Sequence, residues 1–440
     1  MSEGNSVVKV IGGGLSGCES SWQLAQRGIE VVLYESRPHL KSGAHETELL
    51  GELVCSNSLK TMDMNKPAGV LKEELKLLGS LIMDCAEKTS IPAGKALAVD
   101  RLKFSTMITD RIENHPKIRV VREEIKKIPH KNTIIATGPL TSDALSADFK
   151  KYFGDGLNFY DAIAPVVDAS TIDYDKTFTA SRWDEETDGD YINCPLNKSE
   201  YDEMIEFIRI ADQVQLRNFE DARYFESCLP VEVMAMRGHD VLRFGPLRPV
   251  GMKDPHTGKR PWAVIQLRAE NVEKTSYNLV GFQTRMKYGE QKKLISMIPA
   301  LKNATILKYG EMHRNTYIDA PHKLIDGMKI PDLENVFVAG LLTGVEGYME
   351  SVGSGMLTSL RMFHDLQGIS FIPPPPDTSL GAVYRYQNTS AVPYVPTNVN
   401  FGLWPPLEGK MKTAQRRLQM VERARNSFSK WHSDFLAKDI

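Results

Sequence analysis

The sequence has few cysteines, no long apolar run and no strong excess of either charge, and each absence excludes a class of protein. Five cysteines are spread over 440 residues without a CxxC pair, so we expect free thiols and neither a disulfide framework nor a metal site. No apolar run approaches the roughly 20 residues needed to cross a bilayer, and the N-terminal stretch lacks the pattern of an export signal. We therefore expect a cytoplasmic protein that does not associate with membranes.

The formal net charge of -2 argues against a globally basic nucleic-acid binder, but the charge is unevenly distributed. Between Arg237 and Arg268, seven lysines and arginines stand against two acids. Between Lys410 and Lys430, seven stand against one. Such stretches suit a polyanion, and they are equally typical of solvated faces when they do not converge in space.

A βαβ unit is predicted at the N-terminus, with strands over 7–10 and 29–35 and a helix over 16–27. It contains a GxGxxG pattern formed by Gly12, Gly14 and Gly17, and Glu35 follows 18 residues after the last glycine. The first glycine permits a tight turn, the second lets a pyrophosphate approach the backbone, and the third lets the helix pack on the strand. Glu35 is expected to accept a hydrogen bond from a ribose hydroxyl and to repel a 2′-phosphate, which favours FAD or NAD over NADP.

Two later turns favour a flavin over S-adenosylmethionine, whose enzymes also use a glycine-rich loop followed by an acid. The apolar stretches TIIATG and VFVAG end at Gly138 and Gly340, and a helical pattern begins after Glu346. Strands with such ends, on either side of a long insertion, resemble the FAD domains of two-dinucleotide-fold flavoproteins. We predict an α/β fold, with a Rossmann-like FAD-binding domain formed by residues 1–164 and 325–440 and an inserted α+β substrate domain at 165–324.

Motifs spread from residue 7 to about residue 407 resemble the folate- and flavin-dependent RNA (uracil-5-)-methyltransferases. They include VIGGGLSGCESSWQLAQRGIEVVLYESRP, GELVCSNSLK, IPAGKALAVDR, FESCLPVEVMAMRG, LRFGPLRPVG and AGLLTGVEGYMESVGSG. The resemblance implies bound FAD, with Thr343 and Glu346 among the residues on its side of the fold, and reduction by NADH or NADPH. It also implies 5,10-methylenetetrahydrofolate as the one-carbon donor. The implied product is 5-methyluridine in the T loop of tRNA or, as in some relatives, in 23S rRNA, and no obligatory protein partner is evident.

Two cysteines carry the chemistry that the resemblance implies. Uracil C5 is a poor nucleophile until a group adds at C6, and a thiolate suits that addition. Cys228 matches the family cysteine with this role, and the alternative is a structural thiol. Cys55 matches a second family cysteine, placed near the flavin with a supporting role such as removal of the C5 proton. We expect both sulfur atoms to face one cavity beside the flavin.

Other features are structural or leave alternatives open. On a helix predicted over 68–87, an apolar face ends in Cys85, which is therefore expected in the core. Ser227 and Glu46 replace a glycine and a histidine that are common in the family, which leaves the RNA target open between tRNA and rRNA. Arg101 matches a family motif without an assigned role. A flavin oxidoreductase acting on a small molecule and a non-catalytic, FAD-containing RNA-binding protein are the alternative functions.

Overall fold

The computed structural model describes residues 7–40, 44–154, 157–162, 164–182, 189–214, 229–388, 394–409 and 411–436. The catalytic candidate Cys228 and the neighbouring Ser227 lie outside the described residues. The other candidate site residues lie inside them.

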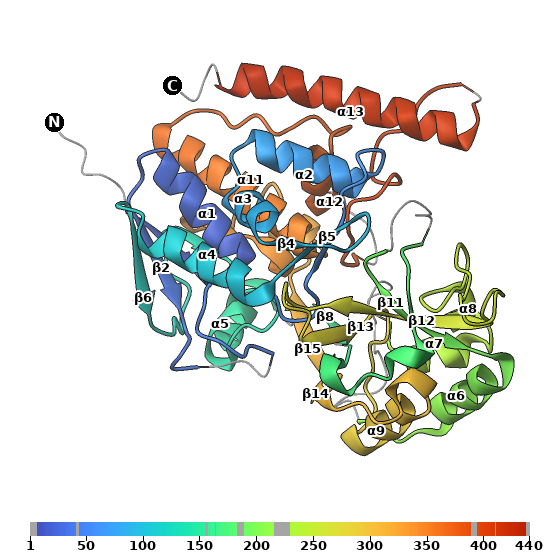
Figure 1. The fold of residues 1–440 in the computed structure, drawn as a ribbon. Coiled ribbons are helices and arrows are strands. Elements are labelled where there is room, and N and C mark those ends of the chain that lie inside the picture. Colours follow the sequence, from blue (N-terminus) through green and yellow to red (C-terminus); the bar gives the residue numbers. More distant parts are fainter. Residues whose placement is uncertain are drawn as a thin grey trace.

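A parallel five-stranded sheet organises the first body of the molecule, in the strand order β16-β7-β1-β2-β6 (Figure 1). The central strand β1 pairs with β2 on one side and β7 on the other, so that Val10 lies opposite both Leu33 and Ile134. β16 follows the long insertion and returns to the sheet beside β7. The strands are β1 (Val8–Ile11), β2 (Val31–Glu35), β6 (Ile118–Arg122), β7 (Lys131–Ile135) and β16 (Glu334–Val338).

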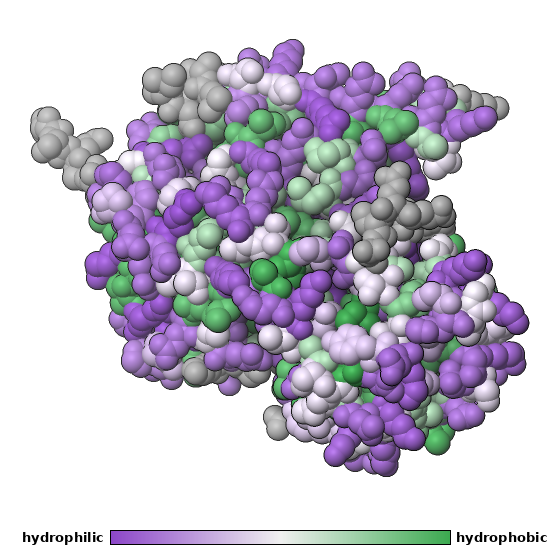
Figure 2. Space-filling model, in the orientation of Figure 1, coloured by the Kyte–Doolittle hydropathy of each residue, from purple (hydrophilic) through white to green (hydrophobic). Residues whose placement is uncertain are grey.

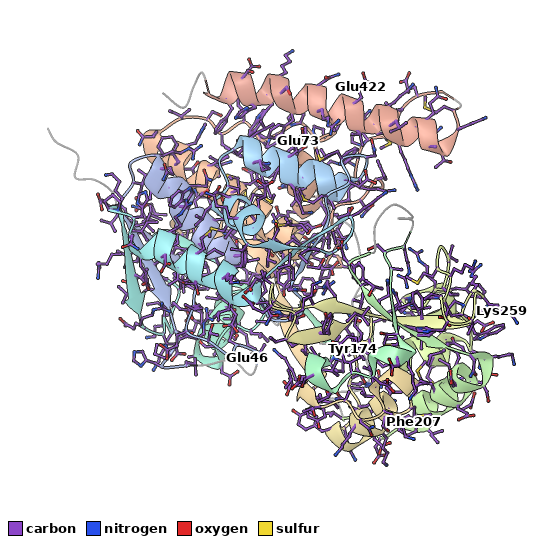
Figure 3. All side chains as sticks on the ribbon, in the orientation of Figure 1. Glu46, Glu73, Tyr174, Phe207, Lys259 and Glu422 are labelled. Carbon is purple, nitrogen blue, oxygen red and sulfur yellow. The ribbon has the colours of Figure 1, made fainter. Side chains whose placement is uncertain are left out.

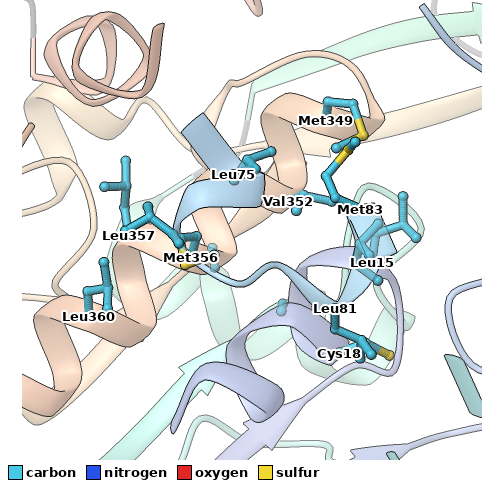
Figure 4. Packing of buried hydrophobic residues seen from close by; sticks show 14 of the residues in the cluster. Leu15, Cys18, Leu75, Leu81, Met83, Met349, Val352, Met356, Leu357 and Leu360 are labelled. Atoms are coloured by element: carbon cyan, nitrogen blue, oxygen red, sulfur yellow. The ribbon is translucent and has the colours of Figure 1, made fainter. Parts of the chain in front are cut away.

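Helices cover both faces of this sheet, and alternation along the strands explains why. Val10 of β1 packs in a core with α1, α2, α3, α4 and α11, whereas the next residue, Ile11, packs in a second core with α5. Figure 4 shows Leu75, Met83 and Met349 converging on the first core from α2, α3 and α11. The helices are α1 (Leu15–Gln26), α2 (Pro67–Leu77), α3 (Leu81–Lys88), α4 (Arg101–Glu113), α5 (Asp143–Phe153), α11 (Tyr348–Gln367) and α12 (Ser379–Gln387).

The predicted βαβ unit is present, with bounds that differ from the expected ones by at most two residues. The prediction of a single helix over 68–87 was wrong, because the helical conformation is interrupted between α2 and α3. Gly79 has a φ of +72°, which glycine adopts without strain. Ser80 then caps α3, and its hydroxyl accepts a hydrogen bond from the backbone N–H of Met83 at 3.2 Å. Cys85 is fully buried, as predicted.

The insertion forms a second body around a six-stranded antiparallel sheet, in the order β10-β11-β12-β13-β9-β14. Its own core includes Cys194, Tyr201 and Phe282. The strands are β9 (Val166–Asp168), β10 (Phe178–Thr179), β11 (Ile192–Leu196), β12 (Ala263–Ala269), β13 (Ser276–Leu279) and β14 (Ile306–Lys308). The helices are α6 (Lys198–Ile210), α7 (Val231–Arg237), α8 (Val241–Phe244) and α9 (Tyr288–Ser296).

A two-stranded ribbon lies where the chain passes between the two bodies (Figure 1). β8 (Leu157–Ala162) leads toward the insertion and β15 (Met312–Tyr317) leads back, and the two strands pair antiparallel along their whole length. The smaller elements among the described residues are β3 (Ser58–Thr61), β4 (Ser90–Ile91), β5 (Ala96–Val99), α10 (Ala320–Lys323) and 3₁₀ turns over 169–171, 174–176, 299–301 and 340–343.

A long helix near the C-terminus, α13 (Thr413–Leu436), lies over α2 at the top of Figure 1. Phe428 and Trp431 of this helix join the core of the parallel-sheet body. Among the described residues, no helix combines the length and the apolar character needed to span a bilayer.

Candidate active site

The turns that follow β1, β7 and β16 meet at one edge of the parallel sheet and line a single cavity. This is expected, because the carboxyl ends of parallel strands lie at the same edge and their loops form the ligand-binding crevice. Five of the residues selected from the sequence line the cavity: Gly12, Gly14, Glu35, Gly138 and Gly340.

The three glycines of the GxGxxG pattern have different environments. Gly12 has a φ of +105°, and a Cβ atom there would lie 2.5 Å from the carbonyl oxygen of Ala136. A Cβ atom on Gly17 would lie 1.8 Å from the carbonyl oxygen of Gly12, so α1 packs too closely on β1 to admit a side chain. At Gly14 an added Cβ atom would meet nothing within 4 Å. The backbone of Gly14 therefore borders open space at the N-terminus of α1, where exposed N–H groups suit a phosphate.

Glu35 ends β2, and protein groups fix its carboxylate on the cavity wall. Oε2 accepts a hydrogen bond from the Gly13 N–H at 2.8 Å, and Oε1 accepts one from Arg37 Nε at 2.9 Å. Burial acts to raise the pKa of Glu35, but the contacts with Arg37 outweigh it and the pKa is lowered. The carboxylate therefore stays charged, and Oε2 retains a lone pair for a ribose hydroxyl. Sequence reasoning did not select Arg37, although its position two residues after the acid was a usable indication.

Two buried hydroxyl groups on the cavity wall favour a polar ligand. Ser16 Oγ and Ser351 Oγ have no hydrogen-bond partner among the described residues. A buried polar group without a partner costs about 1–3 kcal/mol, so such groups call for an explanation. Ser351 lies in the first turn of α11, whose N-terminus has no side-chain cap and presents its partial positive charge to the cavity. Together with the glycine turns, these groups fit an anionic dinucleotide such as FAD.

Thr343 and Glu346 lie near the cavity but not among its lining residues. The Thr343 hydroxyl donates a hydrogen bond to the Gly340 carbonyl at 2.8 Å and accepts one from Gln387. Glu346 Oε2 accepts a hydrogen bond from Asn398 Nδ2 at 2.9 Å. In this structure both residues hold the turn between β16 and α11 from behind the cavity wall.

Cys55 lies beside the cavity, in contact with Tyr348 at the start of α11. Its Sγ is 3.0 Å from Tyr348 Oη, and its backbone N–H donates to the same oxygen at 3.0 Å. Both Val54 and Tyr348 line the cavity. Burial, reinforced by the charge of Cys55, raises the pKa of Tyr348 well above its usual value, so the phenol keeps its proton. The sequence did not single out Tyr348, because 293 residues separate it from Cys55.

The other described cysteines are structural. Cys18, Cys85 and Cys194 are buried, and this burial raises the pKa of all three thiols, to about 12 for Cys85 and Cys194. Cys18 Sγ donates a weak hydrogen bond to the Gly13 carbonyl at 3.4 Å, which ties α1 to the glycine turn. Among the described residues, no three His, Cys, Asp or Glu side chains are grouped so as to hold a metal ion.

Comparison with known proteins decides the family. Residues 7–370 match the family described as Glucose inhibited division protein A. A methylenetetrahydrofolate–tRNA-(uracil-5-)-methyltransferase TrmFO of Geobacter sulfurreducens is 50% identical over 96% of this chain and 98% of its own length. The chain belongs to the TrmFO family. A second TrmFO, from Syntrophus aciditrophicus, is 47% identical and covers 99% of both chains.

A solved structure that resembles this TrmFO-family chain supports the fold. The crystal structure of Aquifex aeolicus GidA matches with a TM-score of 0.71 at 16% identity, over 97% of this chain and 73% of that one. At this identity the likeness concerns the fold alone. It confirms the predicted class, an α/β Rossmann-like fold of the FAD-binding type with an inserted body.

The inserted body of this TrmFO-family chain also carries a cationic surface. Arg248, Lys253, Lys259 and Arg260 are exposed and have no ion-pair partner within the described part of the chain. Lys259 marks the outer edge of this body in Figure 3, and hydrophilic residues prevail there in Figure 2. The exposed ring of Phe244 lies beside Arg243, whose guanidinium lies 3.8 Å from the ring centroid of Trp262.

The second basic stretch, on α13, is partly neutralised within the protein. Arg425 pairs with Glu73 of α2 at 3.0 Å, and Arg423 pairs with Asp377 at 3.3 Å. Hydrophilic residues still cover the exposed side of α13 (Figure 2). Lys412, Arg417 and Lys430 of this stretch are exposed and have no ion-pair partner within the described residues, so both basic stretches offer unpaired charge to a polyanion.

Proposed function

We propose that this chain is a methylenetetrahydrofolate- and FAD-dependent methyltransferase that makes 5-methyluridine in tRNA, with NADH or NADPH as the reductant. The observation that carries the proposal is the 50% identity, over nearly the whole length of both chains, to a protein named for this activity. The cavity at the sheet edge supports it, because its glycine turns and unpartnered hydroxyls fit FAD. Bound FAD would supply the electrons that complete the methyl group.

The residues selected from the sequence take distinct parts in holding this cofactor. Gly12 and Gly17 shape the first turn, and Gly14 exposes backbone N–H groups to the pyrophosphate. The carboxylate of Glu35 accepts a hydrogen bond from a ribose hydroxyl. The turns at Gly138 and Gly340 border the remaining length of the dinucleotide, and Thr343 and Glu346 support the second of these turns from behind.

Two cysteines act on the uridine in this proposal. The thiolate of Cys228 forms a bond to C6, which makes C5 nucleophilic, and this bond breaks again once C5 has lost its proton. The thiolate of Cys55 accepts the C5 proton. The position of Cys55 beside the cavity and in contact with Tyr348 supports this assignment. The role of Cys228 rests on the FESCLP motif alone.

The inserted segment at 165–324 serves as the substrate domain, and residues 1–164 and 325–440 form the FAD-binding domain. The four exposed cations and the exposed Phe244 suit RNA, which offers both phosphates and bases that stack. A uridine of 23S rRNA is the second candidate target, because Glu46 and Ser227 depart from residues common in the family.

One assay tests the proposal. The purified protein is incubated with NADH or NADPH, methylenetetrahydrofolate and either unmodified tRNA or unmodified 23S rRNA, and 5-methyluridine is measured by mass spectrometry. We expect the parent protein to form 5-methyluridine in tRNA and the Cys228→Ala variant to form none. Cys194→Ala is the control, because it removes a buried thiol in the core of the inserted body, and it should keep full activity. Product with rRNA alone changes the target, and product with neither RNA overturns the proposal. NAD(P)H oxidation indifferent to RNA and folate would instead indicate a small-molecule oxidoreductase.

A further inference from the structure

The loop that carries Cys55 is held by two arginines that lie outside it. Arg101, the first residue of α4, donates from Nη1 to the carbonyl oxygen of Leu53 at 2.7 Å. Arg268, on β12 of the inserted body, donates from Nη2 to Ser56 Oγ at 2.7 Å and from Nε to Asn57 Oδ1 at 2.7 Å. The chain is therefore tied to a guanidinium group on both sides of Cys55, through the backbone of Leu53 before it and through the side chains of Ser56 and Asn57 after it.

The same loop joins the two bodies of the molecule. Asn57 is fully buried, and its side-chain nitrogen donates to the carbonyl oxygens of Val99 at 3.1 Å and Ala269 at 2.9 Å. Arg101 also forms an ion pair with Glu270, the residue that follows β12. The position of Cys55 is therefore set jointly by the FAD-binding body and the inserted body.

Arg268 is a buried cation, and no carboxylate among the described residues pairs with it. It is 6% exposed, and its side-chain partners in the described part of the chain are Asn57, Ser56 and Tyr191, which are all neutral. Buried charges are ordinarily paired, because leaving water costs an isolated charge several kcal/mol. Burial accordingly lowers the pKa of Arg268, and the charges of Glu270 and Cys55 act in the opposite direction. An anion close to Arg268 is therefore favoured.

The charged and titratable groups around Cys55 come from several elements. Arg101 on α4 and Arg268 on β12 are positive, and Glu270 beyond β12 is negative and already pairs with Arg101. Tyr348 on α11 keeps its proton and can donate it in a hydrogen bond to an ionised sulfur. Among the described residues, two cations and a hydroxyl donor stand against one anion around Cys55, and such surroundings stabilise a thiolate.

We propose that Arg101 and Arg268 are positioning residues that hold Cys55 at the cavity and stabilise its thiolate, so that the sulfur is ready to accept a proton. The role of Cys55 as a base rests on the proposed function, whereas the stabilised thiolate does not. Because Arg268 belongs to the inserted body, docking of that body on the FAD-binding body sets the ionisation of Cys55.

The rate at which iodoacetamide alkylates Cys55 tests the proposal. The purified protein is alkylated over a pH series, and the peptide that contains Cys55 is quantified by mass spectrometry, which separates it from the other thiols. In the unmodified protein we expect the midpoint of the pH profile at least about one unit below the ordinary thiol value of about 8.5. Arg268→Gln and Arg101→Gln should each raise it by about one unit, because each removes one nearby positive charge.

Three controls separate charge from structure. Arg268→Lys keeps the charge but loses the fork to Ser56 and Asn57, so it should retain most of the lowered midpoint while methyl transfer becomes slower. Arg361→Gln removes an arginine with two carboxylate partners further along α11, and it should leave the midpoint unchanged. Circular dichroism and thermal melting show whether each variant folds.

A midpoint at or above about 8.5 in the unmodified protein overturns the proposal without any variant. An unchanged midpoint in folded Arg268→Gln and Arg101→Gln overturns it as well. The measurement needs neither RNA nor folate. A lowered midpoint in a protein that fails to methylate RNA would therefore overturn the proposed function and leave this inference standing.

Discussion

At the scale of single residues, Gly14 and Gly17 separate cofactor binding from folding. A methyl group at Gly17 would overlap the carbonyl oxygen of Gly12, so Gly17→Ala should lower the free energy of unfolding by about 3 kcal/mol or more. A methyl group at Gly14 meets only open space. Gly14→Ala should therefore unfold within about 1 kcal/mol of the parent in the absence of cofactor, yet lose bound flavin. Urea denaturation and flavin absorbance measure the two effects, and a yellow Gly14→Ala protein would contradict the assignment of the phosphate site.

The contrast between Glu35 and Tyr348 shows which site residues the sequence can predict. Glu35 belongs to one βαβ unit, in which a glycine pattern and a strand end stand at fixed local spacing, so its place on the cavity wall follows from the pattern. Tyr348 meets Cys55 only because β16 and α11 return to the sheet after the insertion. Arg268 reaches the Cys55 loop from the inserted body. Such contacts depend on how distant elements pack, which no local spacing encodes.

At the scale of elements, a buried carboxyl group joins α2 to α12. Glu74 accepts hydrogen bonds from the backbone N–H groups of Ser379 at 2.9 Å and Leu380 at 2.7 Å, which are orphan donors of the first turn of α12. Burial raises the pKa of Glu74 to about 8 and outweighs these hydrogen bonds. The folded state therefore holds a proton that the unfolded chain releases near its ordinary pKa of 4.5.

This difference makes stability depend on pH with a defined sign. The stability from the raised pKa of Glu74 is fully present below pH 4.5 and is lost as the pH rises toward 8. Glu74→Gln, which resembles the protonated form, should not show this loss. Relative to the variant, the parent should lose up to about 1.4 kcal/mol for each pH unit across that window. Urea unfolding of both proteins at several pH values measures the difference, and parallel pH profiles would show that Glu74 is charged when folded.

The C-terminal helix offers a matched pair of substitutions on one element. Trp431 is 6% exposed, packs in the main core, and donates from its indole nitrogen to the carbonyl oxygen of Ile372 at 3.0 Å. Trp431→Ala should lower the free energy of unfolding by about 3–5 kcal/mol. Leu418, on the same helix, is 55% exposed, and Leu418→Ala should change the free energy of unfolding by less than about 0.5 kcal/mol. Equal effects in chemical denaturation would mean that α13 does not pack as described.

Element boundaries show the limit of periodicity as a guide. The apolar residues Leu71, Leu75 and Ile82 continue one helical pattern across the break at Gly79, because α2 and α3 both face the same core. Apolar periodicity predicts which side of a helix is buried. It does not predict where one helix ends and the next begins when both helices face the same core. The local sequence did indicate the interruption, because Gly79 is typical of a helix C-terminus and Ser80 is a favoured N-cap of the next helix.

At the scale of the whole molecule, the two bodies divide the work of the proposed reaction. The parallel-sheet body supplies the cavity and Tyr348, and the inserted body supplies the cationic surface. The ribbon of β8 and β15 and the buried contacts of Asn57 connect them. The residues of the cationic surface are not the ones that hold the Cys55 loop, so RNA affinity and thiol chemistry can be altered separately.

RNA affinity is tested through its dependence on salt. Each lysine or arginine that binds a phosphate releases counterions, so the double variant Lys259→Gln/Arg260→Gln should bind unmodified tRNA more weakly. The slope of its plot of log affinity against log salt concentration should be smaller in magnitude by about two, which is about one for each phosphate that the variant no longer neutralises. Lys131→Gln is the matched control, since Lys131 already pairs with Glu334 at 2.7 Å, and its slope should equal that of the parent. If the double variant keeps the parental slope, the RNA lies elsewhere, and the partly neutralised face of α13 becomes the surface to alter. Because Lys259 and Arg260 are exposed, and Lys259 lies at the outer edge of the inserted body (Figure 3), the double variant should keep the parental alkylation profile of Cys55 whatever happens to its affinity.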